Sequence, residues 1–180
     1  MRRRCRLKAS TAISVVAALV LAAAASSAGI ATQPSVSLIA GSVDGHVLLG
    51  KTVSGVTAAL GKPTWRSGGA TAYRVGYGDR ANFNIMVLFR RRVGIFRAWS
   101  VAFEKPPVYE LRLRMNVLVY PPRAFANAAL NAYGAALKIT RPPRCSATLC
   151  SVTLHVTGTS RNVTYGRTPR LGTFLTLSSG

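Results

Sequence analysis

The chain carries few side chains that could act as acids, bases or metal ligands. Its only carboxylates and histidines are Asp44, Asp79, Glu104, Glu110, His46 and His155. Catalysis needs such groups within hydrogen-bond reach of one another, but Glu104 and Glu110 flank a Pro-Pro pair, and His155 falls on the polar face of a predicted strand. We therefore predict no enzyme. A secreted hydrolase using Asp44 and His46 beside a serine is the catalytic alternative.

The first 28 residues have the layout of a secretory signal peptide. Residues 1–8 contain five basic side chains, residues 9–25 are uncharged and mostly apolar, and Ala28 and Ala31 offer cleavage sites. The alternative is an uncleaved anchor, for which an Ala-rich run of about 17 residues is at the short limit. We predict a secreted or extracytoplasmic protein with no later membrane span, exported by either the Sec or the twin-arginine route.

The charge balance is strongly basic. The chain has 24 Lys and Arg residues against 4 Asp and Glu. Loss of the five basic residues in the signal leaves 19 against 4, a net charge of +15. Such a surface attracts acidic proteins, lipid headgroups and anionic wall polymers. We expect no nucleic acid partner, because the protein is predicted to be exported.

Cys145 and Cys150 are the two cysteines that remain after the predicted signal, with four residues between them. An isolated close pair in an oxidising compartment favours a disulfide over free thiols. A metal site needs about four ligands, and the two histidines do not cluster with this pair. We therefore expect a disulfide, no metal site and no cofactor.

A second group of residues could bind rather than catalyse. It comprises three arginines at a predicted hairpin, an arginine and a tryptophan on the next strand, and two arginines on a further strand: Arg90, Arg91, Arg92, Arg97, Trp99, Arg112 and Arg114. Guanidinium groups form bidentate bonds to carboxylate or phosphate, and tryptophan stacks with cations. If the strands are neighbours, one sheet face carries a basic, aromatic binding surface. Alternatively, the arginines keep the sheet soluble and Trp99 is a core residue.

Hydrophobic periodicity predicts helices and strands in two similar series. Thr52 is a suitable N-cap for a helix with Val53, Val56 and Leu60 on one face, and Pro122 opens a second helix. The predicted strands cover residues 46–49, 71–77, 83–89, 95–103, 110–119, 149–157, 161–166 and 171–178. Residues 140–144 are predicted to be a loop.

The two series match in order: strand, helix, Pro-bearing loop, then three strands. This match indicates an internal duplication. We predict an α+β protein of two tandem units, each a helix packed on an antiparallel β-sheet. The predicted division is a signal peptide over 1–28, a flexible leader over 29–45, and units over 46–104 and 108–180.

The segment Gly50–Pro63 resembles a known helix signature. Its residues match G-x-[ST]-x-x-x-V-x-x-x-L-G-x-P, which is similar to the small extracytoplasmic domain of the β-lactamase-inhibitor protein and of bacterial outer-membrane assembly lipoproteins. That resemblance implies a helix on an antiparallel sheet whose concave face binds proteins. The matched residues are structural, so no functional residue is carried over, and the chain has no lipid-attachment cysteine after its apolar segment.

These observations favour an exported, non-catalytic module of the bacterial envelope or exterior that binds a protein. The second hypothesis is a cationic binder of anionic envelope polymers or lipid headgroups. The oligomeric state is left open.

Overall fold

The structure is a computed structural model that describes residues 34–78, 83–104, 108–169 and 172–180. The fold is mostly β: strands hold 54% of the described residues and helices 19%. The predicted signal peptide lies outside the described residues. No described helix is long and apolar enough to span a bilayer.

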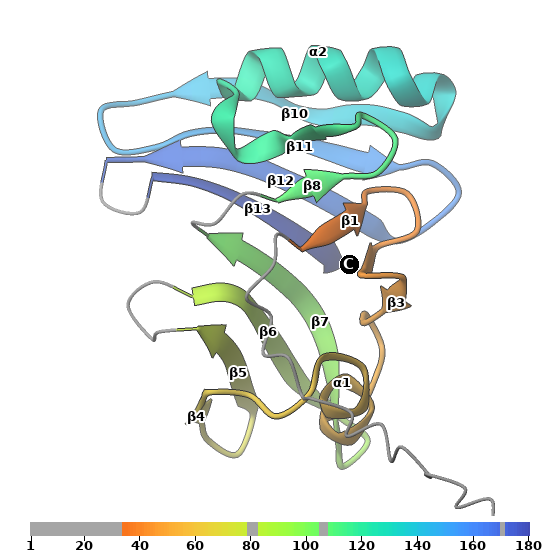
Figure 1. Ribbon diagram of the computed structural model, residues 1–180, viewed down its shortest axis with the longest axis vertical. Helices are drawn as coiled ribbons and strands as arrows, with labels where there is room; N and C mark the ends of the chain where they lie inside the picture. Colours follow the sequence, from red (N-terminus) through yellow and green to blue (C-terminus); the bar gives the residue numbers. More distant parts are fainter. Residues whose placement is uncertain (1–33, 79–82, 105–107, 170–171) are drawn as a thin grey trace, which may run out of the picture.

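A large antiparallel sheet of eight strands forms the centre of the molecule (Figure 1). Its order is β10-β11-β12-β13-β7-β6-β5-β4. Strands β13 and β7 pair from Phe174↔Glu104 to Ser178↔Ser100, which joins the two halves of the chain. The bounds are β4 Trp65–Gly68, β5 Ala72–Gly78, β6 Phe83–Arg92, β7 Ile95–Glu104, β10 Leu137–Cys145, β11 Cys150–Val156, β12 Arg161–Thr168 and β13 Gly172–Ser179.

A second, small sheet contains five very short strands in the order β3-β2-β1-β8-β9. Strands β1 and β8 pair in parallel, and the other pairs are antiparallel. The bounds are β1 Ser35–Ser37, β2 Ser42–Val43, β3 His46–Val47, β8 Tyr109–Glu110 and β9 Met115–Asn116. Residues 35–47 and residues 109–116, which are far apart in the sequence, therefore meet in this sheet.

Both helices begin where the local sequence predicts, and α1 also ends there. Helix α1 (Val53–Leu60) is capped by Thr52, whose hydroxyl accepts the Gly55 N–H at 3.2 Å, and it stops at Gly61. Helix α2 (Pro122–Tyr133) starts on a proline and ends at Gly134, whose φ of 53° suits glycine. Two short 3-10 helices are η1 (Val117–Val119) and η2 (Gly134–Ala136).

All these smaller elements lie on one face of the large sheet (Figure 1). Helix α2 covers β10 to β12, and α1 contacts β7. Phe125 of α2 stacks on Tyr165 of β12 with ring centroids 4.1 Å apart. The Tyr165 hydroxyl lies 2.5 and 2.7 Å from the carbonyl oxygens of Val117 and Tyr120. Apolar side chains on this face form one core. No described helix or strand covers the opposite face of the sheet.

The prediction of two tandem helix-on-sheet units is wrong. The strands of both halves join through β13 and β7 into one sheet, and a separate small sheet lies beside it. The two halves also differ in their helices, because α1 has 8 residues and buries only Val56, whereas α2 has 12 and buries five. A single core shared by both halves replaces the predicted division into units.

Three local predictions also need correction. The predicted leader contains β1 and β2, and its Val36, Leu38 and Val43 are fully or almost fully buried; residues 29–33 lie outside the described residues. The predicted strand over 110–119 is interrupted by a turn between β8 and β9, because Glu110 points into the core and Arg114 adopts a φ of 53°. The predicted loop over 140–144 is part of the edge strand β10.

Candidate functional site

The open face of the large sheet is the surface not covered by any described helix or strand. Its side chains alternate with the buried ones, as the period of two in a strand requires. They are half-buried or exposed, apart from Ser100, Glu104, Gly76 and Gly166, which are buried. Two hollows occupy this face, one at each end of the sheet.

The Trp99 hollow is lined by residues of β4 to β7, including Arg74, Leu88, Arg90 and Trp99, and by Gly69 and Thr71 between β4 and β5. Its volume is about 510 Å³. The guanidinium carbon of Arg90 lies 3.7 Å from the centre of the Trp99 ring. Such a cation–π stack holds both side chains in place and gives the hollow a flat aromatic and cationic wall.

A bulge explains why Trp99 reaches the open face. Leu88 pairs with Ser100 and Phe89 pairs with Ala98, so Trp99 is the extra residue of β7. The bulge reverses the alternation of buried and open-face residues in β7. Before it the even-numbered Ala98 is buried, and after it the odd-numbered Val101 is buried. Simple alternation places Trp99 with Val101 in the core, and the bulge is the reason that this alternative is wrong.

The seven predicted binding residues do not form one cluster. Arg90 and Trp99 are in contact, whereas Arg91 and Arg92 lie exposed at the β6–β7 hairpin. Arg97 is exposed, and its Nη1 donates to the carbonyl of Gly50 at 3.1 Å, which ties β7 to the segment before α1.

Arg112 and Arg114 lie in the turn between β8 and β9, in the small sheet rather than in the large one. The Arg112 guanidinium lies 5.0 Å from the centre of the Tyr133 ring of α2. The predicted joint arginine face of two neighbouring strands is therefore wrong for these two residues, because no alternating strand runs through 111–114.

Glu110, the first residue of the predicted strand over 110–119, is fully buried. One carboxylate oxygen accepts from the Tyr133 hydroxyl and from the Leu38 N–H at 3.3 Å. The other accepts from the N–H groups of Arg112 at 2.9 Å and Leu113 at 2.6 Å. Burial, with the hydrogen bond to Glu110 as a second cause, raises the pKa of Tyr133. Glu110 is therefore bonded to three separate segments of the fold.

Two other candidate catalytic groups, Asp44 and His155, have ordinary structural partners. Asp44 accepts from the N–H and the hydroxyl of Ser35 at 2.7 and 2.9 Å. His155 is half-buried on the open face, as predicted, with its Nδ1 3.1 Å from Oδ1 of Asn162. Asp79 lies outside the described residues. Within the described ranges, no three His, Cys, Asp or Glu side chains are grouped as metal ligands would be.

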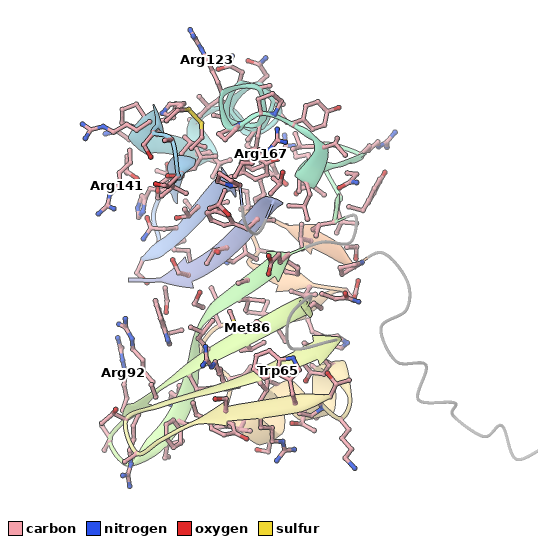
Figure 2. All side chains as sticks on the ribbon, turned by 90° about the vertical axis from the view of Figure 1, so that its left-hand side faces the viewer. Trp65, Met86, Arg92, Arg123, Arg141 and Arg167 are labelled. Carbon is pink, nitrogen blue, oxygen red and sulfur yellow. A yellow bond between two sulfur atoms is a disulfide. The ribbon has the colours of Figure 1, made fainter. Side chains whose placement is uncertain are left out.

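Cys145 and Cys150 form the predicted disulfide. It closes the β10–β11 hairpin and is visible as the yellow bond in Figure 2.

The Arg144 hollow lies at the other end of the open face, beside this hairpin, and has a volume of about 740 Å³. Its lining includes Arg141, Arg144, Ser151, Thr153 and Phe174. Sequence reasoning missed this hollow, because residues 140–144 were predicted to be a loop. The sequence Arg-Pro-Pro-Arg, followed directly by Cys145, is the signal that could have pointed to an arginine pair here.

Comparison with known proteins gives no relative for this chain: no family model, curated protein or solved structure matches it. The class of protein therefore follows from the fold and the two hollows alone. The described part of the chain is a β-rich domain with one covered sheet face and one open face.

Proposed function

We propose that the protein is an exported, non-catalytic module that binds another protein of the bacterial envelope or exterior through the Trp99 hollow. The observation that carries the proposal is the Arg90–Trp99 stack on a sheet face that no described element covers. Tryptophan and arginine are the residue types that most often dominate the energy of protein interfaces.

The surroundings of the stack support a protein partner over a small charged ligand. Leu88 supplies an apolar centre, and Arg74 and Arg90 supply polar groups at its border, which is the usual layout of an interface. The net charge of +15 predicted for the exported chain favours an acidic partner surface and fast association.

The resemblance of Gly50–Pro63 to the β-lactamase-inhibitor protein agrees with this proposal, because that inhibitor also binds with a sheet face. The resemblance rests on a capped helix and carries no contact residue.

The test is capture of partners from the envelope fraction of the producing bacterium with the chain from residue 29 onward. We compare the wild type with Trp99→Ala, Arg90→Ala and Arg123→Ala, and we wash at low and at moderate ionic strength. Arg123 is the matched control because it is exposed on α2, on the covered side of the sheet (Figure 2).

We expect a partner whose capture persists at moderate ionic strength and is lost in Trp99→Ala and Arg90→Ala, but not in Arg123→Ala. Capture that is equal in all four proteins would refute the role of the Trp99 hollow. Circular dichroism checks that each variant keeps the wild-type fold.

A second candidate is charge-driven binding to anionic envelope polymers or lipid headgroups. The exposed hairpin arginines Arg91 and Arg92 favour it, because neither takes part in the stack. Binding of this kind falls steeply with added salt. The double change of Arg91 and Arg92 to Ser should then abolish binding to envelope polymers while leaving capture through Trp99 unchanged.

A further inference from the structure

Two bulges in the edge strand β10 place a pair of arginines on the open face. Ile139 pairs with the buried Leu154, so in a regular strand Arg141 would also face the core. A register shift after Ile139 pairs Arg141 with Thr153 instead, and a second shift pairs Arg144 with Ser151. Residues directly opposite each other share a face. Both guanidinium groups therefore stand on the side of Thr153 and Ser151, away from the core.

Bulges are common at sheet edges and next to functional sites because they redirect side chains. Here the strand also contains Pro142 and Pro143, which an edge strand tolerates because its outer N–H groups have no partner strand. Arg141 and Arg144 are both exposed, and Figure 2 shows Arg141 extending to the same side of the molecule as Arg92. The edge of the sheet thus carries an arginine pair that regular alternation would have separated.

The floor of the Arg144 hollow is rich in hydroxyl groups. Ser151, Thr153 and Thr164 lie on neighbouring strands, and the hydroxyls of Thr153 and Thr164 are 3.3 Å apart. Each hydroxyl can both donate and accept a hydrogen bond. Thr140 and Ser146 add hydroxyls at the border.

One wall of the hollow is aromatic. Phe174 lies across Gly166, where a Cβ atom would come within 2.6 Å of the ring. The missing side chain at Gly166 lets the ring lie against the sheet. Because Phe174 is only half-buried, part of the ring remains available to a ligand.

The charged residues that line the hollow are both basic. They are Arg141 and Arg144, and none of the lining residues is acidic. Glu104 of β7 pairs with Phe174, but its side chain is buried and does not line the hollow. Residues 111–180 contain nine Lys and Arg residues and no Asp or Glu. An oxyanion is the ligand that a pair of guanidinium groups binds best, through bidentate hydrogen bonds.

We propose that the Arg144 hollow binds an anionic saccharide, that is, a sugar that carries a phosphate or a carboxylate. Arg141 and Arg144 bind the oxyanion, the threonine and serine hydroxyls bond to sugar hydroxyls, and Phe174 packs against the apolar face of the sugar ring. This combination of a few polar groups with an aromatic surface is typical of ligand sites. The site does not depend on the Trp99 hollow, which lies at the other end of the sheet.

Isothermal titration calorimetry on the chain from residue 29 onward tests the proposal. The ligands are glucose 6-phosphate, galacturonic acid, glucose, inorganic phosphate and a galacturonic acid oligomer. We expect binding of at least one of the two anionic sugars, and weaker binding of inorganic phosphate and of glucose. If the oligomer binds more tightly than galacturonic acid, the natural ligand is a polymer. If the two bind equally, the natural ligand is a free sugar.

Variants identify the site. Arg144→Gln should lower the affinity for the anionic sugar about tenfold or more, and Thr164→Val should lower it by a smaller factor. Arg123→Gln is the matched control and should have no effect, and Trp99→Ala should also leave sugar binding unchanged. Mass spectrometry confirms that Arg144→Gln protein retains the neighbouring disulfide.

Three results would overturn the proposal. The first is no binding of either anionic sugar. The second is equal affinity for inorganic phosphate and glucose 6-phosphate, which would indicate charge alone. The third is tighter binding of a glutamate-rich peptide at the same arginines, which would assign the hollow to an acidic protein segment.

Discussion

Glu110 is the residue at which a single change should destabilise the fold most clearly. Its carboxylate is fully buried and accepts four hydrogen bonds, from the Tyr133 hydroxyl and from the N–H groups of Leu38, Arg112 and Leu113. These donors belong to α2, to the segment after β1 and to the β8–β9 turn. Removing the carboxylate therefore frees three segments at once.

The free energy of unfolding lost in Glu110→Ala depends on which of the four hydrogen-bond donors water can reach. Arg112 is exposed and Leu113 is half-buried, so their N–H groups can bond to water in Glu110→Ala. Leu38 is 1% exposed and Tyr133 is 7% exposed. Each buried donor left without an acceptor costs ~1–3 kcal/mol, so the Leu38 N–H and the Tyr133 hydroxyl together cost about 2–6 kcal/mol. We expect a loss of that size from a typical total free energy of unfolding of about 5–15 kcal/mol.

Urea unfolding followed by circular dichroism measures this loss. Tyr133→Phe removes one donor and should cost about 1–2 kcal/mol. A double-mutant cycle of Glu110→Gln with Tyr133→Phe should give a coupling energy of at least about 0.5 kcal/mol. Asp44→Asn is the control, because that carboxylate is exposed, and it should stay within about 0.5 kcal/mol of the wild type. A Glu110→Ala protein within about 1 kcal/mol of the wild type would refute the reasoning.

Other perturbations test the two sheets and the core. Tyr165→Phe removes the hydroxyl that holds two carbonyls near η1, and should cost about 1–3 kcal/mol in urea unfolding; an unchanged midpoint would contradict this. Burial raises the pKa of Tyr77 to about 12 and that of Tyr165 still further. The folded state therefore holds these protons more tightly than the unfolded chain, so the tyrosines' contribution to stability is constant below about pH 10, and thermal melts should show stability falling from there toward pH 12. Gly76→Val would place a Cβ 2.0 Å from Cε2 of Trp65, and should cost ~1–3 kcal/mol and change the tryptophan fluorescence. Reduction of Cys145–Cys150 should cost about 2 kcal/mol or less, since it closes a short loop; complete unfolding on reduction would contradict this.

Local signals in the sequence predicted several elements accurately. The Thr52 cap and Gly61 stop define α1, and the alternation of β6, β11 and β12 predicts which of their residues are buried. These features depend on residues within one or two turns of each other, so the sequence is sufficient to predict them. The spacing of the cysteines likewise predicted the disulfide.

Positions where the strand register shifts were not predictable. Simple alternation gives Trp99 and Arg141 the wrong face, because each lies at or after a bulge that appears only when two strands pair. The same holds for Glu110, whose four donors come from segments up to 72 residues away. The sequence pattern alone does not distinguish a buried glutamate from a glutamate on the polar face of a strand.

The sequence by itself determined the strongly basic composition, the starts of both helices, the core-facing side of most strands and the cysteine pair. These properties follow from composition and from contacts between near neighbours in the chain. Only the tertiary structure decided that both halves share one eight-stranded sheet and that its uncovered face carries the Trp99 and Arg144 hollows. The pairing of β7 with β13 and the bulges in β7 and β10 arise from long-range packing, in which one added residue reverses the face of every side chain that follows.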